Sequence, residues 1–165
     1  MPKLDLATAP VKRGSIYPEP YASQMAGRSS LRLGEMAGLT QFGVNLVMLE
    51  PGAVASLRHW HLREDEFAIV LSGALILIED AGETPMGPGD CAAWKAGEAN
   101  GHRFVNRTDA QASFLVIGSK DPDEVCTYSD VDLKLLLTGG KPRFTYHDGS
   151  EWTEPRDLAP KGETE

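Results

Sequence analysis

The sequence has little cysteine, no excess of basic residues and no long apolar run, and each of these absences excludes a class of protein. Only two of the 165 residues are cysteines, Cys91 and Cys126, and their spacing matches no zinc-binding motif. Two cysteines allow one disulfide, but they cannot build a disulfide-rich secreted scaffold. We expect two buried thiols, as is usual in a reducing cytoplasm.

The charge balance and the hydropathy exclude two kinds of partner. The sequence has sixteen lysines and arginines and 24 acidic residues, for a net charge of −8, and the basic residues form no run. Such a chain repels phosphate backbones, so we expect no nucleic-acid partner. No apolar run approaches the ~18 residues of a membrane span, and the N-terminal residues lack the apolar core of a signal peptide. The sequence therefore predicts a soluble, cytoplasmic protein with no membrane partner.

Glycine and proline, by contrast, are frequent. Seventeen glycines and eleven prolines indicate many turns, which favours an all-β fold, and the length fits one domain. Four prolines before residue 21 interrupt any regular element at the start of the chain. We therefore expect an N-terminal arm (residues 1–30), a single barrel domain (31–150) and a C-terminal tail (151–165).

Short apolar segments separated by turn signals occupy the middle of the chain. Their spacing of roughly ten residues is typical of a sandwich or barrel of short strands. The expected strands are residues 43–50, 66–72, 74–79, 91–94, 102–106 and 112–118. The Ser72-Gly73 dipeptide predicts a tight hairpin between the second and third of these strands.

The C-terminal part is less regular. Residues 130–140 (DVDLKLLLTGG) fit a strand or a short helix closed by the glycines, and we expect a helix or irregular structure. Residues 144–149 and 151–153 predict a small closing hairpin.

Two of only four histidines lie one residue apart, in the segment RHWHLREDEF (residues 58–67). On a strand, His59 and His61 would point to the same face and Trp60 to the other. Glu66, which begins the next apolar run, and His102, which opens a later strand, complete a candidate set of metal ligands. The alternative is that these are half-exposed strand histidines with solvated acids behind them.

Two segments resemble the two conserved motifs of the cupin family. Residues 52–73 contain a glycine, His-Trp-His, a glutamate and a second glycine, with one residue more than usual before His59. Residues 88–106 (PGDCAAWKAGEANGHRFVN) resemble the second motif, although Lys95 stands where proline is usual and two extra residues precede His102. The Asn-Gly-His triplet is similar to that of a group of small single-domain bacterial cupins.

This resemblance implies a fold, a metal site and an oligomeric state. The fold is a double-stranded β-helix, or jelly-roll barrel, and the implied ligands are His59, His61, Glu66 and His102, with Glu64 and Asp65 as alternatives to Glu66. Three imidazoles and one carboxylate suit a divalent transition metal such as Fe, Mn, Ni or Zn and leave coordination positions open for a substrate. Paired barrels are common in the family, so we expect a homodimer.

Other residues in and around the two motifs are expected to have structural or surface roles. Trp60 and Trp94 are expected in packing, Phe104 beside His102 in the cavity, and Asn106 in a backbone hydrogen bond. His147 and most of the basic residues near the motifs are expected at the surface (Arg58, Arg63, Lys95 and Arg103). A basic residue that instead faces the pocket would select an anionic substrate.

The cupin family includes many activities, so function remains a hypothesis. We expect a metal-dependent enzyme acting on a small polar, oxygen-bearing molecule, with sugar or sugar-phosphate isomerisation first and dioxygenation second. Glu64, Tyr17 and Tyr128 are the candidate general bases, in no order. The alternative from another class is a non-catalytic module that binds or senses a ligand, and a third is a scaffold without metal.

Overall fold

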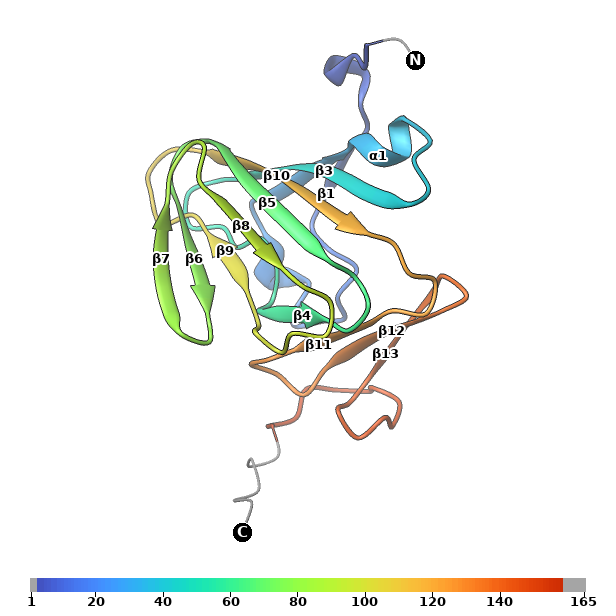
Figure 1. Cartoon of the computed structure of the whole chain (residues 1–165). Coiled ribbons are helices and arrows are strands. Elements are labelled where there is room, and N and C mark those ends of the chain that lie inside the picture. Colours follow the sequence, from blue (N-terminus) through green and yellow to red (C-terminus); the bar gives the residue numbers. More distant parts are fainter. Residues whose placement is uncertain (1–2, 159–165) are drawn as a thin grey trace.

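The computed structural model describes residues 3–158, and strands dominate them (Figure 1). The largest sheet has six strands, in the order β1 (Val11–Arg13), β2 (Arg28–Arg32), β3 (Phe42–Leu49), β10 (Ala112–Ser119), β5 (Glu66–Ser72), β8 (Cys91–Trp94). A second sheet has the order β13 (Lys141–Thr145), β12 (Lys134–Thr138), β11 (Val125–Tyr128), β4 (His59–His61). A third has the order β7 (Gly82–Met86), β6 (Leu75–Glu79), β9 (Arg103–Val105).

Helices are few and short. The described residues contain one α-helix, α1 (Leu33–Met36), and two 3-10 turns, η1 (Leu6–Thr8) and η2 (Ser23–Met25). All strand pairs in the described part of the chain are antiparallel. The all-β prediction is therefore confirmed. No helix among residues 3–158 is long and apolar enough to cross a membrane.

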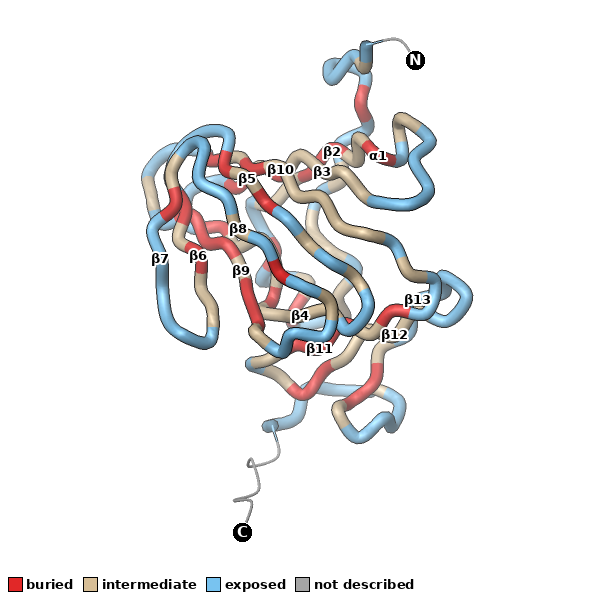
Figure 2. The backbone as a smooth tube through the Cα atoms, in the orientation of Figure 1, coloured by how far each residue is buried: buried red, intermediate tan, exposed pale blue. Residues whose placement is uncertain are grey.

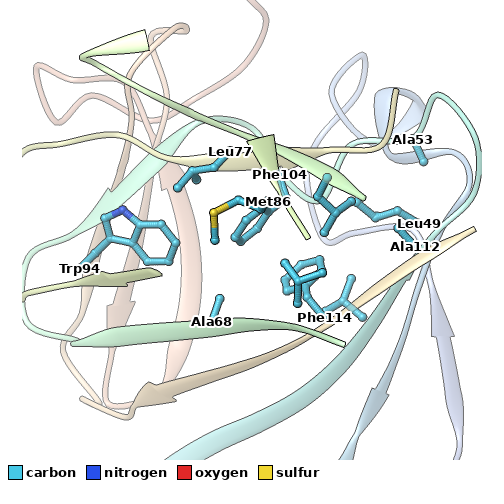
Figure 3. Close-up of a cluster of buried hydrophobic side chains, with 12 residues drawn as sticks. Leu49, Ala53, Ala68, Leu77, Met86, Trp94, Phe104, Ala112 and Phe114 are labelled. Carbon is cyan, nitrogen blue, oxygen red and sulfur yellow. The ribbon is translucent and has the colours of Figure 1, made fainter. Parts of the chain in front are cut away.

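The core lies between the six-stranded and the three-stranded sheets. Figure 3 shows Phe104 and Leu77 of the smaller sheet facing Phe114 and Ala68 of the larger one, and the Phe104 and Phe114 ring centroids are 4.7 Å apart. Alternation along β5 explains the arrangement, because Ala68 and Val70 are buried while their neighbours are not. Burial of each large apolar side chain contributes about 1.5–3 kcal/mol to stability.

A second cluster joins both ends of the chain to the four-stranded sheet. Tyr21 and Met25 from the N-terminal segment are buried with Tyr128 and Leu133, and Trp152 packs against them. In Figure 2 the buried stretches follow β9 and β11, whereas β7 is exposed almost throughout. Residues 11–32 thus contribute two strands and buried side chains to the body of the protein. The domain boundaries at residues 30 and 150 stay predictions.

The predicted hairpin at Ser72-Gly73 is wrong. β5 pairs with β10 and β8, whereas β6 pairs with β7 and β9, so the chain crosses from one sheet to another at Gly73. Gly73 has φ +71°, and a Cβ there would lie 2.8 Å from Cα of Ala112. The turn residues predicted a reversal correctly, but the strand pattern does not specify which strand is the partner.

The helix or irregular structure expected at residues 130–140 is also wrong. Residues 134–138 form β12, which pairs with β11 and β13. Gly139 and Gly140, both with positive φ, make the turn into β13, as in a two-residue hairpin. The small closing hairpin is present, since Thr145 bridges Glu151 and the Tyr146 N–H donates to the Ser150 carbonyl at 2.9 Å.

The two cysteines are not bonded to each other, as expected, but only one is buried. Cys126 is buried beside Tyr128, whereas Cys91 is exposed. Cys91 lies on β8 opposite Ile69, and both belong to the outward-facing row of the six-stranded sheet. The expectation of two buried thiols is therefore wrong for Cys91.

Candidate metal centre

β4 presents two imidazoles to one cavity. His59 and His61 are separated by one residue on this strand, and their ring centroids lie 5.0 Å apart. The strand is held by β11, with Cys126 opposite His61 and Tyr128 opposite His59. All four of these residues line a cavity of about 320 Å³, because opposite residues of an antiparallel pair share a face.

His102 reaches the same cavity from the segment just before β9. It forms an isolated antiparallel bridge with His59, in which the two backbones exchange hydrogen bonds of 2.9 and 3.1 Å. The indole of Trp94 stacks on its imidazole, with ring centroids 3.7 Å apart and planes 10° from parallel. The bridge fixes the backbone of His102 and the indole fixes the plane of its ring.

Glu66, the first residue of β5, places its carboxylate among the three rings. Its Oε2 lies 2.9 Å from Nε2 of His102, 3.7 Å from Nε2 of His61 and 4.0 Å from Nε2 of His59. The Nδ1 of His59 donates to the Leu57 carbonyl at 2.9 Å, so the lone pair of this imidazole is on Nε2. Ring nitrogens and a carboxylate oxygen therefore converge on one point.

Titration of these groups reflects their burial and their proximity. Burial, together with the neighbouring imidazoles, lowers the pKa of His59 to about 3. Burial would raise the pKa of Glu66, but the imidazoles around it outweigh burial and lower the pKa to about 2. His59 is therefore neutral and Glu66 ionised at pH 7, the protonation states that metal coordination requires.

The residues present fit a divalent transition metal. Donor atoms of His59, Glu66 and His102 all lie within 4.8 Å of one another, and those of His61 form similar groups with His59 and Cys126 and with Glu64 and Glu124. A mixed set of imidazoles and carboxylate suits Fe, Mn, Ni or Zn, and a largely covered carboxylate among three largely covered rings is costly without a cation. The cluster is thus consistent with a metal site, and the identity of the four ligands stays a prediction.

Glu124 is a site residue that the sequence did not reveal. It is 2% exposed, and its two carboxylate oxygens accept hydrogen bonds of 2.8 Å from the backbone N–H groups of Leu62 and Arg63. Its Oε1 lies 3.6 Å from Nδ1 of His61. Glu124 comes just before β11, and only the pairing of β11 with β4 brings it to His61.

The three candidate general bases all line the cavity. Burial raises the pKa of both Tyr17 and Tyr128, so these phenols stay protonated at neutral pH. Burial also raises the pKa of Glu64, whose Oε2 lies 3.9 Å from Nδ1 of His61. Glu64 is therefore the one of the three candidates whose side chain is a carboxylate able to accept a proton, as a general base must.

The remaining sequence-predicted residues lie as follows. Phe104 lines the cavity, as expected, and Trp94 packs in the core but also stacks on His102. The fully buried Asn106 donates to the carbonyls of Leu49 and Ala110, as expected. Asp65 is exposed and accepts a hydrogen bond from the Ala96 N–H, away from the three rings.

The basic residues near the motifs differ in exposure. Arg63 and Lys95 are exposed, whereas Arg58 is largely covered and pairs with Asp80 and Asp130. Arg103 is half-buried and lines the cavity, and its Nε has no hydrogen-bond partner among residues 3–158. The fourth histidine, His147, is partly exposed and contacts the Leu133 carbonyl, outside the cavity.

Comparison with known proteins agrees with the fold. The cupin domain family matches residues 45–118. A crystal structure of a sugar phosphate isomerase of the cupin superfamily from Silicibacter pomeroyi is 56% identical, covers 92% of this chain and 97% of its own, and superposes with a TM-score of 0.90. The chain therefore belongs to the cupin superfamily.

More distant structures share the fold alone. A candidate sugar phosphate isomerase from Acidithiobacillus ferrooxidans is 24% identical over 84% of this chain and 96% of its own, with a TM-score of 0.69. The polyketide cyclase RemF from Streptomyces resistomycificus is 23% identical over 73% of this chain and 80% of its own, with a TM-score of 0.59. A search of curated proteins gave no match.

Proposed function

We propose that this chain is a metal-dependent sugar phosphate isomerase with His59, His61, Glu66 and His102 as the ligands of a divalent transition-metal ion. The observation that carries the proposal is the convergence of these four side chains in a cavity, in a chain 56% identical to a sugar phosphate isomerase. Fe, Mn, Ni and Zn all suit the donor set. The substrate class is a small, polar, oxygen-bearing molecule.

The cavity residues supply what an isomerisation needs besides the ion. A bound divalent ion would act as a Lewis acid toward a substrate carbonyl. Glu64 takes the proton from the hydroxyl-bearing carbon next to that carbonyl and returns it to the former carbonyl carbon, while the proton of that hydroxyl passes to the former carbonyl oxygen. Tyr17 and Tyr128 stay protonated and donate hydrogen bonds to substrate oxygens. The buried rings of Trp94, Phe104 and Phe114 limit the entry of water.

The test is a turnover assay on untagged protein whose metal content is measured by elemental analysis. We expect about one Fe, Mn, Ni or Zn per chain, interconversion of an aldose phosphate and a ketose phosphate by NMR, and loss of metal and turnover in His61→Ala. Glu64→Gln should keep the metal but lower kcat by about 100-fold or more, since general base catalysis contributes roughly 10²–10⁴-fold. Glu98→Gln, at an exposed site, is the control.

Two outcomes would replace the proposal. Consumption of O₂ with an iron-loaded protein, without turnover of any sugar phosphate, would point to a dioxygenase. A metabolite that co-purifies and is never converted would point to a binding module.

We also infer a homodimer formed through the outer face of the six-stranded sheet. Phe67 lies opposite Ala93 and Ile117, and Ile69 opposite Leu115, so an apolar row faces outward on three adjacent strands. Phe67 and Leu71, the outward residues of β5 on either side of Ile69, are 38% and 47% exposed. Contiguous apolar patches of this kind are rare on monomeric proteins.

Light scattering would test the dimer. We expect twice the chain mass of 17.9 kDa for the wild type and the monomer mass for Leu71→Glu. Leu39→Glu, at an exposed position after α1, should leave the dimer intact. A monomeric wild type would contradict the inference. The cytoplasmic location expected from the sequence stays a prediction.

A further inference from the structure

The inner face of the six-stranded sheet carries basic side chains at the edge formed by the N-terminal segment. Lys12 lies opposite Ser30, which lies opposite the fully buried Val47, so these residues share the inner face. Arg28 and Arg32 are two residues to either side of Ser30 on β2 and therefore face the same way. Three cations thus point inward from β1 and β2.

These cations border the same cavity as the metal centre. Lys12 and Arg28 line it together with His59 and Glu66, and they also line an adjoining hollow of about 270 Å³ that Arg32 and Lys120 border. β2 lies three strands from β5 in the sheet, about 14 Å at the usual ~4.8 Å per strand. The long side chains of Lys12 and Arg28 reach across part of this distance. One extended substrate can therefore contact these cations and the candidate metal ligands at the same time.

The charge at this end is not balanced by the protein. Among residues 3–158, no carboxylate lies within 4.0 Å of Lys12 or Arg28, whereas Arg32 pairs with Glu35 at 2.6 Å. Burial and the neighbouring Arg32 and Arg28 lower the pKa of Lys12. Like charges held together in a partly buried site are stabilised by an anion.

Arg28 is oriented before any ligand binds. Its Nε donates to the Ala55 carbonyl at 2.7 Å and its Nη1 to the Gly14 carbonyl at 3.2 Å. Of the five guanidinium N–H groups, those on Nη2 have no acceptor among the described residues. A guanidinium fixed on one edge with a free nitrogen on the other suits a phosphate oxygen.

The end of the cavity that holds the candidate metal ligands is unfavourable for a phosphate group. Glu64, Glu66 and Glu124 gather around His61, so the end with the candidate ligands carries the carboxylates. A substrate with one charged and one neutral end therefore has one favourable orientation. Its anionic group lies by β1 and β2, and its carbonyl and hydroxyl groups lie by the imidazoles.

We propose that Lys12 and Arg28 form the phosphate subsite of this cavity, with Arg32 and Lys120 on its outer rim. This inference rests on the proposed function, because it assigns the phosphate end of the same substrate. The N-terminal segment is accordingly part of the binding site. The subsite selects phosphorylated sugars over the free sugars through its two unpaired cations.

The test compares Lys12→Met with Arg13→Met in metal-loaded protein. Arg13 is the next residue of β1, exposed on the opposite face, and is the matched control. Lys12→Met should raise KM for the sugar phosphate by about 10- to 100-fold, the range of a lost hydrogen bond to a charged group. Lys12→Arg should restore KM, and Arg13→Met should match the wild type.

Calorimetric titration with inorganic phosphate separates the two proposals, since it needs no turnover. We expect the wild type and Arg13→Met to bind phosphate, and Lys12→Met and Arg28→Gln to bind it at least about 10-fold more weakly. If phosphate binding depends on Lys12 but the protein has no isomerase activity, the subsite is supported and the proposed isomerase function is contradicted. If the protein is an isomerase but Lys12→Met and Arg13→Met have equal KM and equal phosphate affinity, the proposed function is supported and the subsite is overturned.

Discussion

Glu124 links the backbone that follows β4 to the imidazole ring of His61 in the candidate metal centre. Its carboxylate accepts from two successive N–H groups after β4, and one oxygen lies 3.6 Å from Nδ1 of His61. Burial would raise the pKa of Glu124, but the His61 ring and the two N–H groups outweigh it and lower the pKa. An ionised carboxylate at this position favours the His61 tautomer with the proton on Nδ1, which leaves Nε2 free to coordinate.

Replacing Glu124 by Gln should therefore weaken metal binding. We expect a loss of about 10- to 100-fold in affinity, because outer groups that orient a ligating histidine typically contribute that much. Competition with a chelator of known affinity would measure it, with Glu98→Gln as the exposed control. An unchanged affinity would show that His61 is held without Glu124.

The sequence could predict the residues whose relation is local, and missed those whose relation is not. His59 and His61 share a face because side chains alternate along a strand, and Phe104 shares the face of His102 for the same reason. Glu66 and His102 were candidates because each stands at the start of an apolar strand segment, and the cupin resemblance implied the same two residues. Glu124 could not be predicted, since it approaches His61 only through the pairing of two strands far apart in the sequence.

At the scale of elements, the crossing at Gly73 determines which sheet receives β6. The residue combines φ +71° with a close approach to Ala112, whose Cα and Cβ would both lie 2.8 Å from an added Cβ. A side chain would therefore meet backbone as well as adopt a left-handed conformation. The turn depends on glycine for both reasons.

Gly73→Ala should destabilise the protein by roughly 2–4 kcal/mol, the sum of backbone strain and steric overlap. Gly149→Ala is the matched control, since Gly149 has φ +88° but nothing within 4 Å of an added Cβ, and strain alone should cost about 1 kcal/mol. Chemical denaturation of both variants would give the difference. Equal losses would show that the contact with Ala112 relaxes freely.

Strand positions were largely predictable and strand partners were not. The apolar alternation and the turns located most strands between residues 42 and 119. The hairpin at Ser72-Gly73 was wrong because a tight turn is compatible with crossing between sheets. β12 was missed because the apolar pattern of LKLLL fits both the two-residue period of a strand and the 3.6-residue period of a helix. Only its pairing with β11 and β13 makes it a strand.

At the scale of the whole molecule, Asp132 ties the C-terminal segment to the body. It is 5% exposed, and it accepts from the His147 N–H and from the guanidinium of Arg156, which also covers the Tyr146 ring. Burial would raise the pKa of Asp132, but these partners outweigh it and lower the pKa. Residue 156 of the expected tail is thus held against the four-stranded sheet.

Stability should consequently fall in acid as Asp132 becomes protonated. A carboxyl whose pKa is lower in the folded state stabilises the fold above its unfolded pKa of about 3.9, and the contribution is lost as pH falls through the folded value. Thermal unfolding between pH 6 and roughly pH 2 should show a smaller decline of Tm for Asp132→Asn than for the wild type. Parallel curves would contradict this role.

The order in which strands pair has a consequence for folding. β3 joins β10, and β4 joins β11, so both pairings connect early and late parts of the chain. Contacts so distant in sequence form slowly, and a chain still on the ribosome lacks the partner strands. The strand that carries His59 and His61 thus lacks its partner strand in the four-stranded sheet until β11 emerges. Binding of a metal ion at the candidate centre would accordingly follow synthesis and closure of the barrel.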